Sequence, residues 1–284
     1  MTLVLCVNVP QTCILLGSME ILQAILLGVI EGLTEFLPIS STGHLIIAEK
    51  YIDFKDTAKI FTVVIQMGAM AAVVWYYRID IWQNIKGFFA GSASARRFIT
   101  NLAIAAIPAG LLGLALDKQF EAYATAKVVA AALILGALML WLADRVPKPG
   151  AEEPKPQFGK ISPRQALGIG LMQCFALIPG VSRSGAAIVG GLLGGLNRVT
   201  ATAFSFYLGV PILVVAGLYK LVRGWDDLGS ISGGAASIII GVVVSFVVAL
   251  LSIAWLIGYV SRHSFKVFVY YRIILGIIVL LLLV

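Results

Sequence analysis

Residues 21–52 read ILQAILLGVIEGLTEFLPISSTGHLIIAEKYI, in which two apolar segments flank the polar turn PISSTGH at residues 38–44. A membrane-spanning helix needs about 20 mostly apolar residues, and neither segment, 21–37 or 45–51, is comfortably long enough. Irregular backbone survives at membrane depth only where protein buries it or where it lines a wet cavity. The stretch therefore predicts a re-entrant helical hairpin, which enters the membrane and turns back inside it.

The composition of the whole chain indicates that most of it lies in a lipid bilayer. Of its 284 residues, 60% are hydrophobic and 12% are charged, and the mean hydropathy is +0.99. A soluble domain is about 25% charged and could not hide so much apolar surface. The same values exclude intrinsic disorder, collagen, a coiled coil and a disulfide scaffold. The net charge of +7 then belongs to cytoplasmic loops rather than to a nucleic-acid surface, and the three cysteines are expected to be free thiols.

A second hairpin and six spans follow from the same pattern. Residues 165–196 repeat the arrangement of the first hairpin, 21–52, around the turn PGVSRSG at residues 179–185. Two of the spans contain Pro108 and Pro211, which membrane helices tolerate where neighbours satisfy the freed backbone groups. The fold class is thus an all-α polytopic membrane protein. The expected spans are residues 60–77, 98–116, 128–143, 202–219, 235–258 and 267–284.

The chain also contains a weak internal repeat. A shift of 142 residues places Gly28 on Gly170 and Ser40 on Ser182 without a gap. Repeat one is expected at residues 19–145 and repeat two at 165–284, joined by a cytoplasmic linker at 146–164. Three spans per repeat is an odd number, so the second copy is expected to be inverted relative to the first. The two hairpins would then enter from opposite faces, and their turns would form one shared site near the middle of the bilayer.

Cationic residues predict the orientation. The loops after the first, third and fifth spans hold more Lys and Arg than the loops after the second and fourth, and loops of that kind face the cytoplasm. The first hairpin and the C-terminus are then expected to face outward. Residues 1–18 are expected to be an N-terminal extension without chemistry, either a frayed segment or sequence ahead of a true start at Met19.

Two acidic residues lie on the first arm. Glu31 and Glu35 are four residues apart and share one helical face. An ionisable group in the middle of a membrane costs at least ~2.5–3.5 kcal/mol on insertion scales, so the pair indicates a divalent-metal site or an acid–base pair. Carboxylate oxygens suit Mg²⁺ or Ca²⁺, which often keep waters and substrate phosphates as further ligands. The alternative is two acids that are solvated near the interface.

The first turn gathers hydroxyls and an imidazole at the start of a helix. Ser40, Ser41, Thr42 and His44 lie within five residues, and a helix N-terminus offers free N–H groups to a phosphate. Any one of these hydroxyls could instead be an N-cap. His44 could be a structural hydrogen-bonding residue, a general base, a nucleophile or the acid for a leaving group.

The second turn carries an arginine between two serines, Ser182 and Ser184. Arg183 presents a fixed fork of donors that matches phosphate geometry. Opposite two glutamates, it is expected to clamp an anion rather than to snorkel to the interface, which is the behaviour expected of Arg272 in the last span. The segment GGLLGG at 190–195 indicates close helix packing. Together these residues predict a phosphate-handling site in lipid, whose substrate is a lipid phosphate or diphosphate with its tail between helices.

The segments EGLTEFLPISSTGH at residues 31–44 and PGVSRSG at residues 179–185 closely resemble the two signature motifs of the bacterial undecaprenyl-diphosphate phosphatase family, which is also known for bacitracin resistance. The resemblance covers residues 19–284. It implies hydrolysis of undecaprenyl diphosphate to undecaprenyl phosphate and inorganic phosphate, which recycles the lipid carrier for peptidoglycan synthesis. It also implies two inverted repeats in the bacterial inner membrane, with an active site reached from the periplasmic side.

The resemblance implies a catalytic set of Glu31, Glu35, Ser41, His44 and Arg183. A divalent cation, Mg²⁺ or Ca²⁺, is expected on Glu31 and Glu35. Ser41 is expected to attack the terminal phosphorus while His44 handles the proton, with His44 or a water as alternative nucleophiles. Where the family motif commonly has a threonine, this chain has Ala187, so Ser184 or a water would replace that hydroxyl. The residues expected to bind the substrate phosphates are Ser40, Thr42, Ser182, Arg183 and Ser184.

Two other classes of protein fit parts of the pattern. A transporter could use an inverted repeat with broken helices for alternating access, but it would not need a cluster of reactive hydroxyls and an imidazole. A structural scaffold would leave the buried charges unexplained. The expected partners are a polyprenyl diphosphate and the bilayer, without nucleic acid. The sequence leaves open a homodimer, translocation of the lipid carrier and the choice of cation.

Overall fold

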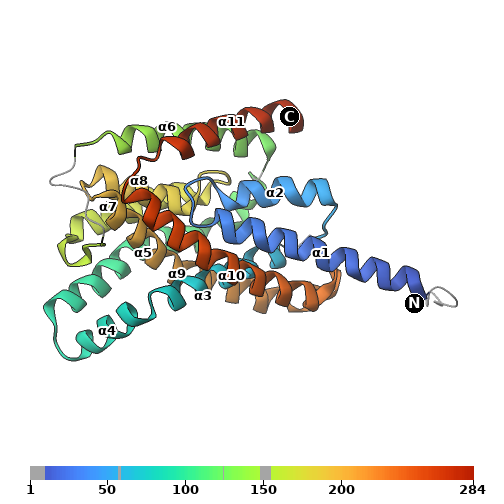
Figure 1. Ribbon diagram of the computed structural model, residues 1–284, viewed down its shortest axis with the longest axis horizontal. Helices are drawn as coiled ribbons and strands as arrows, with labels where there is room; N and C mark the ends of the chain where they lie inside the picture. Colours follow the sequence, from blue (N-terminus) through green and yellow to red (C-terminus); the bar gives the residue numbers. More distant parts are fainter. Residues whose placement is uncertain (1–9, 57–58, 124, 148–154) are drawn as a thin grey trace.

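The computed structural model of the chain describes residues 10–56, 59–123, 125–147 and 155–284, with the backbone alone at 10–18, 117–118 and 120–122. Every regular element in these ranges is a helix (Figure 1). The expected N-terminal extension and linker fall partly on residues 1–9 and 148–154, which lie outside the described residues. The first half contains α1 (Pro10–Thr34), α2 (Ser41–Ile52), α3 (Ile60–Tyr76), α4 (Arg78–Phe89), α5 (Ala93–Ala122) and α6 (Ala126–Asp144). The second half contains η1 (Phe158–Lys160), α7 (Pro163–Cys174), η2 (Phe175–Leu177), α8 (Arg183–Leu193), α9 (Arg198–Arg223), η3 (Trp225–Ser230), α10 (Gly234–Val260) and α11 (Lys266–Leu283).

The long apolar helices make the chain a multi-pass membrane protein. In the described residues, α5 as far as Leu116, α6, α9, α10 and α11 are five helices that are long and apolar enough to cross a membrane. A sixth span is reached if α3 and α4, which are bent by 72°, count as one. Helical backbone angles break inside α5 at Leu116, where φ is −125° and ψ is 17°.

A helix occupies part of the segment that was expected to be a loop after residue 77. No residue of α4 is buried, and the side chains of Ile79, Trp82 and Phe89 are exposed at intervals of three and seven residues. This spacing gives an apolar stripe on one helical face. The loop expectation was wrong here because short amphipathic helices carry too many polar residues to resemble a span.

Local capping defines where several helices begin. Ser162 accepts a hydrogen bond from the Gln165 amide, and the Gln165 side chain accepts one from the Ser162 amide, which forms a capping box ahead of α7. Asn197 caps α9 through the Thr200 amide at 2.7 Å. These contacts supply acceptors for N–H groups that a helix cannot satisfy itself.

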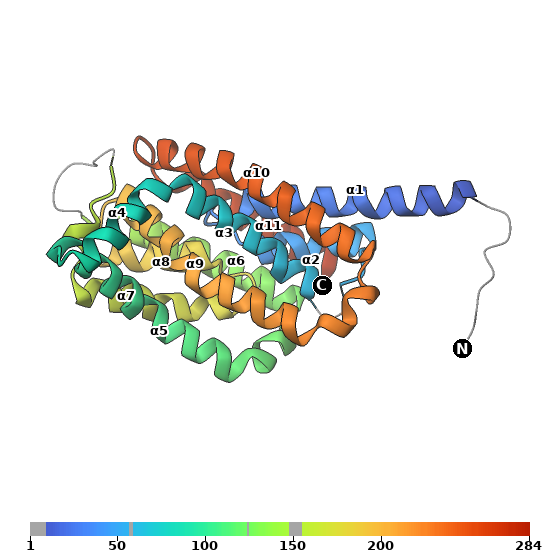
Figure 2. The ribbon, with the colours of Figure 1, turned by 90° about the horizontal axis from the view of Figure 1, so that it is seen from below.

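The helices pack in a reciprocal pattern. The first arm α1 packs along α10, and the arm α7 of the second hairpin packs along α5 (Figures 1 and 2). The pairs α3 with α9 and α6 with α11 also lie side by side. Gly28 and Gly170, which are equivalent in the repeat, allow close approach, because a Cβ would lie 2.8 Å from the Gly241 carbonyl oxygen on α10 and 2.5 Å from the Ala105 carbonyl oxygen on α5. Small residues at such contacts are typical of membrane helices.

The two hairpin turns have matching backbone geometry. Ser40 immediately precedes α2 with φ of 73°, and Ser182 immediately precedes α8 with φ of 77°. Each serine hydroxyl accepts a hydrogen bond from the amide of the glycine three residues later, Gly43 at 3.3 Å and Gly185 at 3.1 Å. Positive φ is rare outside glycine and costs of order 1–3 kcal/mol. The shared strain at positions 142 residues apart is a structural counterpart of the sequence repeat.

Candidate active site

The two turns meet inside the helix bundle. The Ser184 hydroxyl at the start of α8 donates to the carbonyl of Leu37, the residue just before the first turn, at 3.1 Å. Arg183 Nη2 donates to Glu35 Oε1 at 2.9 Å. The structure therefore brings residues separated by nearly 150 positions into one buried cluster, which contains acidic, basic and hydroxyl groups.

A chain of three side chains forms the centre of this cluster. Ser41 Oγ donates to Glu35 Oε2 at 2.5 Å, while Arg183 binds the other oxygen of the same carboxylate. The side chains of Glu35 and Arg183 are only 4% and 11% exposed. A carboxylate that accepts the proton of a serine hydroxyl can act as its general base, and the arginine holds that carboxylate in place.

Arg183 keeps donors that the protein does not use. Its Nη1 donates to the Ser205 carbonyl on α9 at 2.6 Å, and its Nε has no hydrogen-bond partner among the described residues. Guanidinium carries five N–H donors, so Arg183 can bind an anion without releasing Glu35. Gly209 provides the space for this side chain, because a Cβ there would lie 2.6 Å from Nη1.

Glu31 lies one helical turn before Glu35 and is fully buried. Neither of its carboxylate oxygens has a hydrogen-bond partner among the described residues. A buried, unpaired carboxylate is costly, so the geometry calls for a proton or a cation at this position. The expected metal-binding role of Glu31 and Glu35 is compatible with these unpartnered oxygens.

The donor set is nevertheless small for a metal. In the part of the chain that the structure describes, no group of three or more His, Cys, Asp or Glu residues could hold an ion, and Glu35 is already bonded to Ser41 and Arg183. Mg²⁺ often completes its shell with waters and substrate phosphates. The residues thus fit a cation that is shared with a phosphorylated substrate better than one held by protein alone.

His44 is bonded on both sides of its ring. Nδ1 lies 2.7 Å from the Ser40 carbonyl oxygen, and Nε2 lies 2.6 Å from the hydroxyl of Tyr271 on α11. Because a carbonyl only accepts, Nδ1 must carry a proton, and a neutral ring then accepts from Tyr271 at Nε2. The proton of Ser41 is directed at Glu35 and not at His44, which favours the structural alternative for this histidine.

The remaining hydroxyls have structural contacts as well. Ser40 is the N-cap of α2, which is one of the alternatives that the sequence left open for the first turn. Ser182 is the N-cap of α8, a contact that the sequence analysis did not predict. Ser184 is fully buried and lies 3.1 Å from the Ser182 hydroxyl. Thr42 is partly exposed in the first turn of α2. Ala187, where the family motif commonly has threonine, is buried in the apolar core.

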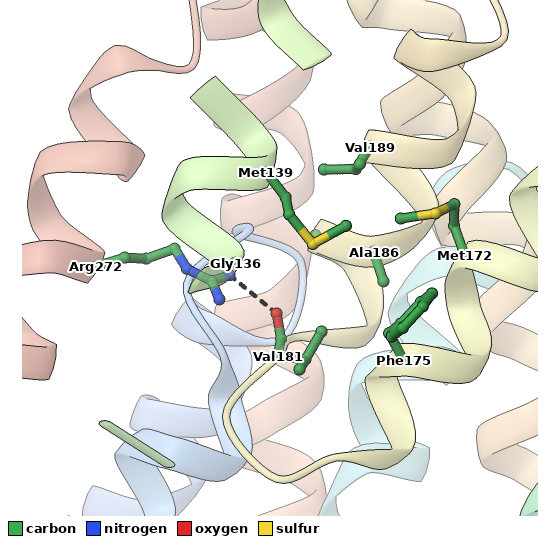
Figure 3. A pocket seen from close by; sticks show the side chains of 9 residues that line it. Gly136, Met139, Met172, Phe175, Val181, Ala186, Val189 and Arg272 are labelled. Atoms are coloured by element: carbon green, nitrogen blue, oxygen red, sulfur yellow. Dashed lines mark hydrogen bonds between the residues drawn. The ribbon is translucent and has the colours of Figure 1, made fainter. Parts of the chain in front are cut away.

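The expectation that Arg272 snorkels to the interface was wrong. This residue is 1% exposed, and its guanidinium reaches inward past Gly136 to the second turn, where it donates to the Val181 carbonyl (Figure 3). Sequence reasoning also missed Tyr271 and the Ser205 carbonyl. An arginine in the middle of an apolar span was a usable signal, because such a charge requires partners inside the protein.

A small apolar cavity borders the second turn. Its lining combines Met139 of α6, Met172 and Phe175 around the end of α7, and Val189 of α8, with Arg272 at one side (Figure 3). Flexible methionines adapt to irregular apolar shapes. Apolar side chains thus border this side of the second turn.

Comparisons with known proteins agree over nearly the whole chain. A family model described as bacitracin resistance protein BacA matches residues 24–278. Undecaprenyl-diphosphatase 1 of Burkholderia lata is 47% identical over 265 residues, which cover 92% of this chain and 95% of the relative. Undecaprenyl-diphosphatase 3 of Acinetobacter baylyi is 45% identical over 268 residues, which cover 93% and 98%. An undecaprenyl-diphosphatase of Acinetobacter baumannii is 46% identical over 267 residues, which cover 93% and 96%.

Proposed function

Because the chain belongs to the bacitracin resistance protein family BacA, we propose that it is a membrane phosphatase that converts undecaprenyl diphosphate to undecaprenyl phosphate and inorganic phosphate. The observation that carries the proposal is the buried chain from Ser41 to Glu35 to Arg183. A hydroxyl, a carboxylate and a guanidinium in contact support the proposed roles of nucleophile, general base and anion-binding group. A carrier that only translocates a lipid has no need for such a hydroxyl.

The chemistry follows from these contacts. Ser41 Oγ attacks the terminal phosphorus, and its proton passes to the Glu35 carboxylate. The bond from that phosphorus to the bridging oxygen breaks, and undecaprenyl phosphate leaves with the bridging oxygen. A water then attacks the phosphorus of the phosphoserine, and the bond from phosphorus to Ser41 Oγ breaks. Inorganic phosphate leaves with the hydrogens of the water, and Ser41 Oγ takes back the proton held by Glu35, which restores both the hydroxyl and the carboxylate. Such phosphoryl transfer depends mainly on positioning and charge stabilisation.

Arg183 stabilises the charge that develops on the transferred group. Its unpartnered Nε–H and remaining N–H donors are available to phosphate oxygens while Nη2 stays on Glu35. Charge-assisted hydrogen bonds from guanidinium to phosphate are among the strong ones. The N-termini of α2 and α8 end at the same cluster, and their dipoles also favour an anion there.

A divalent cation is proposed as the cofactor, held by Glu31 together with Glu35. When bound, Mg²⁺ or Ca²⁺ would neutralise the diphosphate and reduce repulsion between the substrate and the two carboxylates. The unpartnered oxygens of Glu31 support this assignment.

The proposed setting is the bacterial inner membrane, with the two repeats inverted. The first hairpin lies at the end of the bundle that carries the C-terminus, and α7 and α8 lie toward the opposite end (Figure 1). Reciprocal packing of α1 on α10 and of α7 on α5 supports the inversion. Most of the exposed cations at chain junctions belong to the end with α4 and α7, which supports a cytoplasmic position for it. They are Lys86, Arg96, Arg97, Arg145, Lys155, Lys160, Arg164, Arg262 and Lys266.

The cellular role proposed here is recycling of the lipid carrier for peptidoglycan. The substrate is reached from the periplasmic side, and its tail lies between helices near the apolar cavity of Figure 3. Bacitracin resistance would follow because turnover removes the diphosphate that bacitracin sequesters.

The test is direct product analysis with purified protein in detergent. Undecaprenyl diphosphate is the substrate, and inorganic phosphate and undecaprenyl phosphate are both quantified. The proposal expects the two products in equal amounts, with inorganic pyrophosphate cleaved far more slowly because it lacks the tail. Release of pyrophosphate with free undecaprenol, or no release by well-folded protein, would contradict it.

A further inference from the structure

Within the described part of the chain, the guanidinium of Arg272 donates to five backbone carbonyls. Nε donates to Leu133 at 3.1 Å, Nη1 donates to Pro38 and Val181 at 3.0 Å each, and Nη2 donates to Ala132 at 3.0 Å and Gly180 at 3.3 Å. Five donors are all that a guanidinium possesses. Arg272 therefore has no donor left for a phosphate, in contrast to Arg183.

Three of these carbonyls belong to the two hairpin turns. Pro38 lies in the first turn, and Gly180 and Val181 lie in the second. Turn carbonyls lack the partners that helical carbonyls have, so a buried donor is needed to satisfy them. Pro38 and Gly180 are also equivalent positions under the shift of 142 residues. A single side chain from α11 thus holds the same carbonyl of both turns.

Two groups of the proposed reaction lie within these turns, at the residues where the following helices begin. Ser41 is the first residue of α2, and Arg183 is the first residue of α8. A relative movement of the turns would separate Arg183 from Glu35. It would also change the direction of the hydrogen bond from Ser41 Oγ to Glu35. We propose that Arg272 is a positioning residue, which locks the two turns together and so sets the geometry of Ser41, Glu35 and Arg183. The inference rests on the proposed function and deepens it.

Gly136 on α6 is the partner that makes this arrangement fit. A Cβ at position 136 would overlap Arg272 Nη2 and would lie 2.8 Å from Cζ. The guanidinium passes this glycine on its way to the second turn (Figure 3). Gly136→Ala should therefore displace Arg272 although position 136 touches none of the reacting groups.

The experiment compares Arg272→Lys, Gly136→Ala and the double variant with the wild-type protein, and uses Gly258→Ala as the matched control. Gly258 is also in a spanning helix, but a Cβ there meets no atom within 4 Å. Lysine has three donors and cannot serve five carbonyls. Both kcat and KM are measured for phosphate release from undecaprenyl diphosphate.

Arg272→Lys and Gly136→Ala are each expected to lose roughly 10- to 100-fold in kcat, because small misplacements of reacting groups are costly. The KM for the lipid should change less than about 3-fold in both, and the control Gly258→Ala should match the wild type. The double variant should be no slower than Arg272→Lys, since the shorter side chain no longer meets the new methyl group. Wild-type kcat in Gly136→Ala, or losses that multiply in the double variant, would overturn the inference. If Arg272→Lys does not fold, Gly136→Ala decides alone.

Hydrogen exchange of the turn peptides, residues 36–44 and 178–186, gives a readout that does not depend on activity. Exchange should rise in both peptides in Arg272→Lys and Gly136→Ala, and should stay at the wild-type level in Gly258→Ala. Unchanged exchange in both peptides would contradict the inference. If the wild-type protein releases no phosphate, the proposed function fails, whereas the exchange comparison still tests the lock between the turns.

Discussion

Arg183 Nη2 lies 2.9 Å from Glu35 Oε1, so that the first residue of α8 is paired with the residue that follows α1. The pair joins the two hairpins at their turns, and both side chains are nearly buried. Removing one partner of a buried pair leaves the other charge uncompensated. The contact therefore links the assembly of the two halves to the chemistry that they carry.

Arg183→Ala should reduce kcat/KM for phosphate release by ~100-fold or more, the usual cost of a major charge-stabilising donor. Arg183→Lys should recover little of this loss, because an ammonium cannot reach Glu35, the Ser205 carbonyl and a phosphate together. Arg262→Ala, in the exposed loop before α11, serves as the control. Full activity in Arg183→Ala would exclude the anion-binding role.

Gly209→Ala should impair Arg183 without removing its side chain, and should therefore lose less activity than Arg183→Ala. The added Cβ would lie 2.6 Å from Arg183 Nη1 and 2.7 Å from Cζ, so the side chain must shift away from the Ser205 carbonyl. A loss of about 10-fold in kcat is expected, since misplaced groups are costly. Gly110→Ala is the matched control, because a Cβ there meets no atom within 4 Å. Equal rates in the two variants would show that Arg183 does not need its observed position.

Glu31→Gln distinguishes two ways of neutralising the Glu31 carboxylate, which are a bound cation and a bound proton. If a cation binds there, the variant should need at least ~10-fold more Mg²⁺ for half-maximal activity after treatment with EDTA. If the carboxyl is instead protonated, glutamine should preserve both the rate and its metal dependence. Phosphate release is measured across a series of Mg²⁺ concentrations, with Ca²⁺ in parallel.

Tyr271→Phe tests whether His44 handles the proton of the nucleophile. The substitution keeps the ring that stacks on His44 but removes the hydroxyl that bonds Nε2. Losing one neutral hydrogen bond is worth about 1 kcal/mol, or a factor of about 5 in rate. A much larger loss, accompanied by a changed pH profile of kcat, would indicate that His44 transfers the proton of the nucleophile.

Much of the architecture could be predicted from residue patterns, because a bilayer imposes simple rules of length and polarity. The two turns were predicted from the sequence, and in the structure both have positive φ, at Ser40 and Ser182. The first arm was expected at residues 21–37, whereas α1 runs over Pro10–Thr34, and the re-entrant course of the hairpins stays a prediction. The family suggested by the two motifs is confirmed by the match over residues 24–278. Helix α4 was missed because its apolar face is only a narrow stripe.

The contacts within the site were harder to predict, because they depend on three-dimensional packing. The sequence placed Glu31 and Glu35 on one face, but it could not show that Glu35 would bond Ser41 and Arg183 while Glu31 bonds neither. Arg272 was misinterpreted because its five acceptors are backbone carbonyls, which carry no residue-specific signal. Tyr271 was missed because tyrosine is common near membrane interfaces.

The most direct measurement is phosphate release from undecaprenyl diphosphate by Ser41→Ala and Glu35→Gln, beside the wild-type protein and the control Ser261→Ala at the end of α10. All four proteins are compared at equal folded fraction in the same detergent. The account predicts that the first two variants lose at least ~100-fold in rate while the control matches the wild type. Activity in Ser41→Ala equal to that of the control would contradict the account, because the nucleophile would then lie elsewhere.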